Sequence, residues 1–189
     1  NPTNITQTAT YTVTPTSGTS GACIGAPFTV VVTVNPRPFI MNISQSTCSA
    51  QNIVITPTNG GGNIIPVGTT YSWAAPSVTG GMTGGSAGTN QTTFNFTLTN
   101  STNTLQTATY NVTANSGSCV GSVFTIAVTV YPRPTVAGDV LTQTICSGTA
   151  FAPITLSNPN GVPGTIDYTW TRNNTVNVTG MASSGNGSP

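Results

Sequence analysis

The stretch FTIAVTVYPRP at residues 124–134 repeats an earlier stretch, FTVVVTVNPRP, at residues 28–38. In the later copy four apolar residues, Phe124, Ile126, Val128 and Val130, alternate with threonine or alanine. This period of two predicts a strand with one buried face. Both copies end in Pro-Arg-Pro, which stops a strand because proline has no amide hydrogen for the ladder. The two copies lie 96 residues apart.

Four further landmarks repeat with nearly the same offset. QTATYTVT at 7–14 returns as QTATYNVT at 106–113, SGACIG around Cys23 as SGSCVG around Cys119, QSTC ending at Cys48 as QTIC ending at Cys146, and TYSW ending at Trp73 as DYTW ending at Trp170. The offsets stay between 96 and 99 residues. A fixed period of this length predicts a repeated unit the size of one small domain.

Pro-Arg-Pro divides the chain into three pieces. Residues 1–38 match the C-terminal part of a unit, residues 39–134 form a complete unit, and residues 135–189 match the N-terminal part of the next. We expect the chain to continue on both sides. The alternative is that neighbouring chains complete each other head to tail, with Cys146 of one chain pairing with Cys23 of the next.

The complete unit is predicted to be an immunoglobulin-like antiparallel β-sandwich. Short strands are expected at 39–44, 51–56, 69–74, weakly at 77–82, and at 92–99, 107–114 and 123–130. About seven short strands in a unit of about 96 residues, with a tryptophan on the third, favour this fold. The glycine-rich stretches at 60–62 and 79–88 are expected to be flexible loops. The predicted core residues are Trp73, Phe94, Phe96, Tyr110 and Phe124, together with Trp170 in the next unit.

Composition argues against catalysis and against several classes of ligand. The 189 residues contain three arginines and two aspartates, and no lysine, glutamate or histidine. General acid–base catalysis and activated nucleophiles need such groups, so we expect no enzyme activity and no cofactor. Three scattered arginines predict no nucleic-acid binding, and the lack of clustered carboxylates or Cys/His sets predicts no metal site. No apolar run is long enough to predict membrane insertion.

The four cysteines point to an oxidising, extracellular setting, because no metal-ligand pattern accompanies them. Within the complete unit we predict a disulfide between Cys48 and Cys119, as a clip across one end of the sandwich. It would close a loop of about 70 residues and contribute roughly 4 kcal/mol. Cys23 and Cys146 are expected to pair with cysteines outside the segment.

The motifs ICSGT, YSW, TATYxVT, SGSCxG and FTxxVTVxPRP, which together span the chain, resemble the PKD-like repeats of very long Bacteroidetes surface proteins, including the SprB-type gliding adhesins of flavobacteria. The resemblance implies tandem immunoglobulin-like modules, export by the type IX secretion system, and a role as an adhesin stalk or filament on the cell surface of a Gram-negative bacterium. It carries no catalytic motif.

Three functions are weighed on this basis. The leading one is a structural repeat segment of a very large secreted adhesin or filament, whose partners are neighbouring repeats of the same chain and surface polysaccharide or other cells. The alternatives are a polymerising, homo-oligomeric filament subunit and a carbohydrate-binding accessory module. The last needs exposed aromatics among Tyr71, Trp73, Tyr110 and Tyr131, and loss of polysaccharide binding in Tyr131→Ala would support it.

Overall fold

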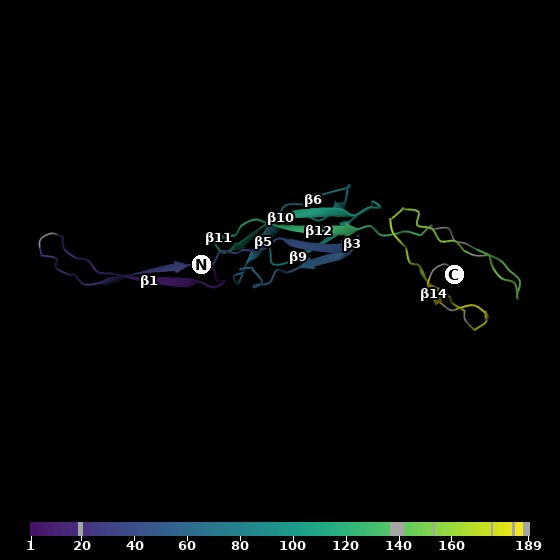
Figure 1. Ribbon diagram of the computed structural model, residues 1–189, viewed down its shortest axis with the longest axis horizontal. Coiled ribbons are helices and arrows are strands. Elements are labelled where there is room, and N and C mark those ends of the chain that lie inside the picture. The colour runs from purple at the N-terminus through teal and green to yellow at the C-terminus, as the bar shows by residue number, and fades with distance from the viewer. Residues whose placement is uncertain (19–20, 137–141, 153, 175, 183, 187–189) are drawn as a thin grey trace.

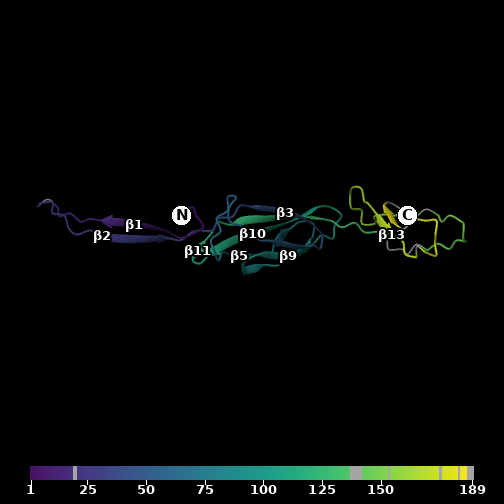
Figure 2. The same ribbon diagram turned by 90° about the horizontal axis from the view of Figure 1, so that it is seen from below.

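The computed structural model describes residues 1–18, 21–136, 142–152, 154–174, 176–182 and 184–186, and these form strands and loops without a helix. Figure 1 shows three bodies in a row: a long hairpin, a β-sandwich and a looped segment that carries one short strand pair. The view from below keeps this order (Figure 2). The architecture is therefore all-β, as the alternating pattern predicts.

The sandwich consists of a large and a small sheet. The large sheet has the order β3 (Ile43–Cys48), β12 (Phe124–Tyr131), β10 (Gln106–Ser116), β5 (Thr70–Trp73) and β8 (Gly88–Gln91), with β6 (Ser77–Val78) and β11 (Cys119–Val120) also pairing with β10. The small sheet has the order β4 (Asn52–Ile55), β9 (Phe94–Thr99) and β7 (Thr83–Gly84). Outside the sandwich, β1 (Gln7–Val13) pairs with β2 (Phe28–Val34), and β13 (Thr169–Thr171) with β14 (Ser184–Asn186).

The core lies between the two sheets and is built from alternating side chains. Every second residue of β9, β10 and β12 is buried, because successive side chains of a strand point to opposite faces. The Phe94 ring centroid lies 4.5 Å from that of Trp73 and 5.2 Å from that of Tyr71. The core contains Trp73, Phe94, Phe96, Tyr110 and Phe124. Trp170 is only half-buried, and the described residues of its piece pair in a single two-stranded sheet, β13 with β14.

The strand after the first Pro-Arg-Pro differs from the prediction in place and direction. It was expected at 39–44 in an antiparallel sandwich, but β3 begins at Ile43 and runs parallel to β12, with Ile43 opposite Ile126 and Cys48 opposite Tyr131. Residues 39–42 instead connect the first Pro-Arg-Pro to β3 and contact other parts of the sandwich. Phe39 forms an isolated bridge with Ile64, and the Asn42 side chain accepts a hydrogen bond from the Thr125 amide at 2.9 Å.

The expected loop at 79–88 contains the strand β7 and the first residue of β8, Gly88, which lies under a tryptophan ring. Gly88 lies opposite Trp73 in the β5–β8 pair, and a Cβ there would be 2.3 Å from the ring. Gly185 lies opposite Trp170 in the same way, with a Cβ 2.7 Å from the ring. The Trp73 indole also donates to the Ser86 carbonyl at 3.0 Å. A side chain at either glycine would push the tryptophan away.

Tyr110 makes alkaline pH a test of this core. Its hydroxyl is buried without a hydrogen-bond partner in the described part of the chain, and burial raises the pKa of Tyr110 to about 12. Burial also raises the pKa of Tyr71. An unfolded tyrosine titrates near pH 10, so from about pH 10 to 12 the unfolded chain loses protons that the folded chain keeps. The free energy of unfolding should be nearly flat from about pH 4 to 9 and then fall as pH rises.

Tyr110→Phe is expected to remove much of this alkaline loss and to leave stability at pH 7 unchanged or raised by about 1 kcal/mol, because it deletes an unpaired buried hydroxyl. Urea unfolding followed by circular dichroism at several pH values would measure both effects. Tyr131→Phe is the matched control, since Tyr131 is 47 % exposed. An alkaline loss that is the same in Tyr110→Phe as in the parent chain would contradict this assignment.

Candidate functional site: the joints between units

The described residues hold little of the chemistry that catalysis needs. Asp167 is exposed, and Asp139 lies outside the described residues. Across the described ranges, no three His, Cys, Asp or Glu side chains come together in a way that could hold a metal ion. A search of the same ranges found no helix suited to crossing a membrane.

The four aromatic residues weighed for carbohydrate binding do not form an exposed platform. Tyr71, Trp73 and Tyr110 belong to the buried core, and Tyr131 alone among the four is exposed. Stacking on a sugar needs an accessible ring face. Of these four rings, the structure thus leaves Tyr131 as a candidate, at the end of β12 beside the second Pro-Arg-Pro.

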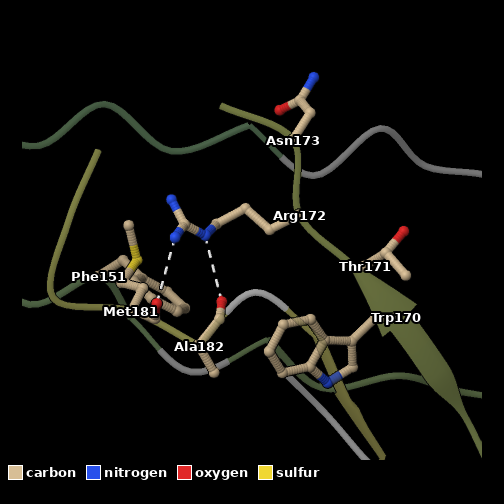
Figure 3. A pocket seen from close by; sticks show the side chains of 7 residues that line it. All are labelled: Phe151, Trp170, Thr171, Arg172, Asn173, Met181 and Ala182. Carbon is tan, nitrogen blue, oxygen red and sulfur yellow. Dashed lines mark hydrogen bonds between the residues drawn. The ribbon is translucent and has the colours of Figure 1, made fainter. Parts of the chain in front are cut away.

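The C-terminal piece contains a hollow of about 830 Å³ (Figure 3). Its lining includes Phe151 and Trp170, and the Arg172 guanidinium closes one side by donating to the Ala182 and Met181 carbonyls at 3.1 and 3.2 Å. By the repeat offset, Phe151 matches Ile53 and Trp170 matches Trp73. In the complete unit, these positions pack against the strand β9. In the C-terminal piece the matching positions line an open hollow instead.

The hairpin of β1 and β2 exposes a face that the complete unit buries. Its register equals that of β10 and β12: Gln7 lies opposite Val34 as Gln106 lies opposite Val130. Tyr11 is 58 % exposed, whereas its counterpart Tyr110 is fully buried. The other exposed apolar residues of this face are Val13, Phe28, Val30, Val32 and Val34. In the described part of the chain no further strand pairs with this hairpin, so its apolar face stays open.

An asparagine corner at the start of each hairpin was missed by our sequence analysis. The Asn100 amide donates to the Thr104 and Val130 carbonyls at 2.8 and 2.9 Å, while its oxygen accepts from Thr102. Asn1 makes the same set of bonds with Ile5, Val34 and Thr3. The shared NxTN pattern at 1–4 and 100–103 is the signal that could have revealed it.

The first Pro-Arg-Pro packs tightly against the sandwich. Pro36 and Pro38 are buried, and the Arg37 Nε atom donates to the Val120 carbonyl at 2.6 Å. A Cβ at Gly121 would lie 2.6 Å from the Pro38 carbonyl oxygen, so this approach requires glycine. The first Pro-Arg-Pro is therefore a fixed contact between units, beyond the stiff linker that two prolines predict.

Beside this linker the base of the hairpin also faces the sandwich across a small hollow. A small hollow of about 360 Å³ is lined from the hairpin side by Asn4, Ile5, Thr6, Asn35 and Pro36, and from the sandwich side by Pro66, Val67, Ser116, Gly117 and Ser118. The base of the hairpin thus faces the β10–β11 turn. We call this contact, with residues 36–38, the first joint.

The second joint is the contact between the complete unit and the C-terminal piece around Arg133, and asparagine side chains make its hydrogen bonds. The Asn160 amide donates to the Arg133 carbonyl at 2.7 Å, and its oxygen accepts from the Thr135 amide at 3.1 Å. Asn103 reaches across to the Gly161 carbonyl at 3.3 Å. Arg133 matches Arg37 by the repeat offset, but the position that would match Val120 falls after residue 189.

The predicted Cys48–Cys119 disulfide is wrong for this fold. Both thiols are free, and they lie at opposite ends of the large sheet. Cys48 is opposite Tyr131, at the end of β12 that lies next to the start of β10. Cys119 is opposite Ser116, at the other end of β10. In the register of β10 with β12, the two cysteines are eleven residue positions apart along the strands. At about 3.3 Å per residue this is roughly 35 Å, whereas disulfides need Cα atoms within about 7 Å. The parallel course of β3 carries Cys48 away from the end that Cys119 occupies.

The free thiols Cys23 and Cys146 are both exposed. Cys23 lies near the tip of the hairpin, next to the isolated bridge between Thr16 and Ile24. Their predicted pairing with cysteines outside the segment stays a prediction.

Arg37→Ala tests whether the first joint is held by the arginine. Because Arg37 is exposed and its bond is made to a single carbonyl, we expect less than about 1 kcal/mol of lost stability. Amide hydrogen exchange in residues 117–121 should nevertheless rise several-fold, because local opening depends on local contacts. Arg172→Ala is the control and should leave those amides unchanged. Equal exchange in the parent chain and Arg37→Ala would show that the prolines suffice.

Comparison with known proteins agrees with this architecture. The fold is that of an immunoglobulin-like β-sandwich. The family model for the PKD-like domain matches residues 1–38 and 45–134, so the chain belongs to the PKD-like domain family. Domains of this family are typically extracellular, generally lack catalytic activity, and serve structural or adhesive roles. A search of curated proteins returned no significant match.

Proposed function

We propose that the chain is a run of repeat units within a very large secreted adhesin or filament of the gliding-motility or surface-attachment type. It would be exported by a type IX secretion system to the surface of a Gram-negative, Bacteroidetes-like bacterium. The observation that carries this proposal is the hairpin of β1 and β2, which has the register of β10 and β12 but an exposed core face.

Such a hairpin needs a cover to be stable. A two-stranded hairpin is marginal in water, and an exposed apolar face of this kind favours association. In the complete unit the cover comes from β3, β5 and the small sheet, all of which precede β10 in sequence. Residues of the same kind preceding residue 1 would bury Tyr11, Phe28 and their neighbours, and would turn the hairpin into a unit.

The arrangement suits a stalk. Hairpin, sandwich and C-terminal piece lie one after another along one axis (Figures 1 and 2), and the first joint is packed. The outward strand faces are mostly threonine and asparagine, so few groups titrate and salt has few charges to screen. We expect the units to contact their neighbours in the same chain and, in the cell, surface polysaccharide or other cells, without catalysis of their own.

The test is the mass of the native polypeptide on a denaturing gel with reductant. A reduced mass far above the 19.1 kDa of these residues would support the repeat protein. A reduced band near 19 kDa would contradict it.

A second candidate, a polymerising filament subunit, is favoured by the match between the two ends of the chain. Residues 135–189 correspond to the complete unit from residue 39 to about residue 92, and residues 1–38 correspond to it from residue 100 onward. Joined head to tail, two copies would lack only a counterpart of β9, the strand whose place is the hollow beside Trp170. A reduced band near 19 kDa with multiples in non-reducing conditions would support this candidate.

A further inference from the structure

We propose that consecutive units are linked across each joint by a disulfide between the counterpart of Cys48 in one unit and the counterpart of Cys119 in the next. The inference rests on the proposed tandem arrangement. It replaces the disulfide expected within the unit with a link between units, and it assigns a role to two thiols that the fold holds apart.

The two cysteines mark opposite ends of the sandwich. Cys48 ends β3 beside Tyr131, the last residue of β12, where the chain leaves the unit. Cys119 begins β11 next to Val120, whose carbonyl holds Arg37 where the chain enters the unit. In a head-to-tail array, the exit of one unit faces the entry of the next, so each joint receives one cysteine of each kind.

The first joint shows how close these positions come. Asn35 matches Tyr131 by the repeat offset, so the Cys48 counterpart of the preceding unit would lie beside Asn35, as Cys48 lies beside Tyr131. Asn35 lines the same joint hollow as Ser118, the residue before Cys119. Two residues further along the chain, Arg37 bonds to Val120, the residue after Cys119. The repeat therefore brings the two cysteine positions to the same joint.

The exposure of the thiols fits this pairing. Cys48 is exposed and Cys119 is half-buried beneath the joint, so neither belongs to the core and both can be reached by an oxidant. Cys23, the counterpart of Cys119, lies near the far tip of the hairpin, at the entry end of its own unit. Cys23, Cys48 and Cys119 thus each lie at one end of their unit.

The link forms by thiol–disulfide exchange with a disulfide oxidant outside the cell membrane, such as an oxidised dithiol protein or oxidised glutathione. One cysteine thiolate attacks the oxidant and releases one thiol, forming a mixed disulfide. The second cysteine thiolate attacks that mixed disulfide and releases the other thiol. The two cysteines lose two protons and two electrons, and the oxidant takes up both as two thiols.

Such a link would make each joint doubly connected. The Pro-Arg-Pro segment is the first covalent connection between two units. The disulfide would be a second one, from the end of β3 in one unit to the start of β11 in the next. A joint held at two points resists bending and twisting more than one held by a single strand. It would also keep the hairpin base seated against the β10–β11 turn when the stalk is pulled.

The test is a disulfide map of the native polypeptide. Free thiols are blocked with N-ethylmaleimide, the protein is digested with chymotrypsin, and the peptides are identified by mass spectrometry before and after reduction. We expect Cys48 to be joined to a cysteine in the following unit and Cys119 to one in the preceding unit. Blocked thiols at both positions, or a Cys48–Cys119 link, would overturn the proposal.

The map separates this inference from the proposed function. A long reduced polypeptide with blocked thiols would keep the stalk and overturn the link. If the reduced polypeptide is only 19 kDa, the stalk fails, but links Cys48–Cys23 and Cys119–Cys146 between chains would still uphold pairing across joints. A Cys23–Cys146 link between chains would overturn it, because those two positions lie at opposite ends of one composite unit.

A single substitution in the 189-residue chain provides a second test of proximity. Asn35→Cys places a thiol where the joint brings in the preceding unit. Incubation with oxidised and reduced glutathione should give a disulfide between residue 35 and Cys119, identified by peptide mapping. The control Thr10→Cys, in the middle of β1, should give no such link. If residue 35 pairs with Cys119 no more than residue 10 does, the joint geometry does not support the link and the proposal fails.

Discussion

Replacing Trp73 with alanine is expected to unfold the complete unit or to leave it barely stable. Trp73 is 9 % exposed, packs its ring 4.5 Å from Phe94, and donates to the Ser86 carbonyl. Truncation of a buried tryptophan costs about 3–5 kcal/mol through lost burial and the cavity that remains. Small domains have only about 5–15 kcal/mol of stability, so this loss is a large fraction.

Trp170→Ala is the matched control. Trp170 has the same strand position and the same glycine opposite, but it is half-buried beside a hollow. Its truncation should change the main unfolding transition by less than about 1 kcal/mol. Urea unfolding followed by far-ultraviolet circular dichroism avoids dependence on tryptophan fluorescence. Equal losses in the two variants would contradict the assignment of residues 39–134 as the complete unit.

Asn100→Ala is expected to produce the next largest loss, about 2–4 kcal/mol. Asn100 is 5 % exposed, and its side chain bonds to the Val130 and Thr104 carbonyls and to Thr102. The backbone N–H of Asn100 donates to the Ser49 hydroxyl at 2.9 Å. Through its backbone and side chain, Asn100 therefore connects the ends of β3, β9 and β12. Alanine would leave several buried polar groups without partners, and each costs about 1–3 kcal/mol.

The chain contains a control for this corner as well. Asn1 makes the same bonds at the base of the hairpin, where all partners are exposed, so water can replace its side chain. Asn1→Ala should change stability by less than about 0.5 kcal/mol. Asn100→Asp keeps the acceptor oxygen but loses both donated bonds and places a buried carboxylate against the Val130 and Thr104 carbonyls, so it should destabilise the chain at least as much as Asn100→Ala. A loss in Asn1→Ala as large as in Asn100→Ala would show that burial does not set the cost.

The core strands could be predicted because their pattern reports burial directly. β9, β10 and β12 lie within two residues of the predicted ranges, since each buries alternate large side chains. The strand β8 was missed because its residues, GTNQ, have no apolar alternation. It is compatible with a strand because Gly88 fits beneath Trp73. This contact joins two different strands, so the residues around Gly88 alone do not reveal it.

The joints could be located but not described from sequence. Pro-Arg-Pro marks where units meet, because proline ends a strand and stiffens the connection to the next unit. That Arg37 bonds to the Val120 carbonyl, and that Gly121 admits the Pro38 carbonyl, depends on residues more than 80 positions away. Neither contact has a signature in the local sequence beyond a glycine and an arginine.

The repeat, the all-β sandwich and the buried stripe of each long strand could all be read from the chain, because periodicity and side-chain alternation are local properties of a sequence. The direction of β3, and with it the place of Cys48, came from the fold alone. A strand pattern has the same period in either direction, so it cannot say at which end a residue will lie. Only pairing with β12 separates Cys48 from Cys119, and this separation is the basis of the proposed link between units.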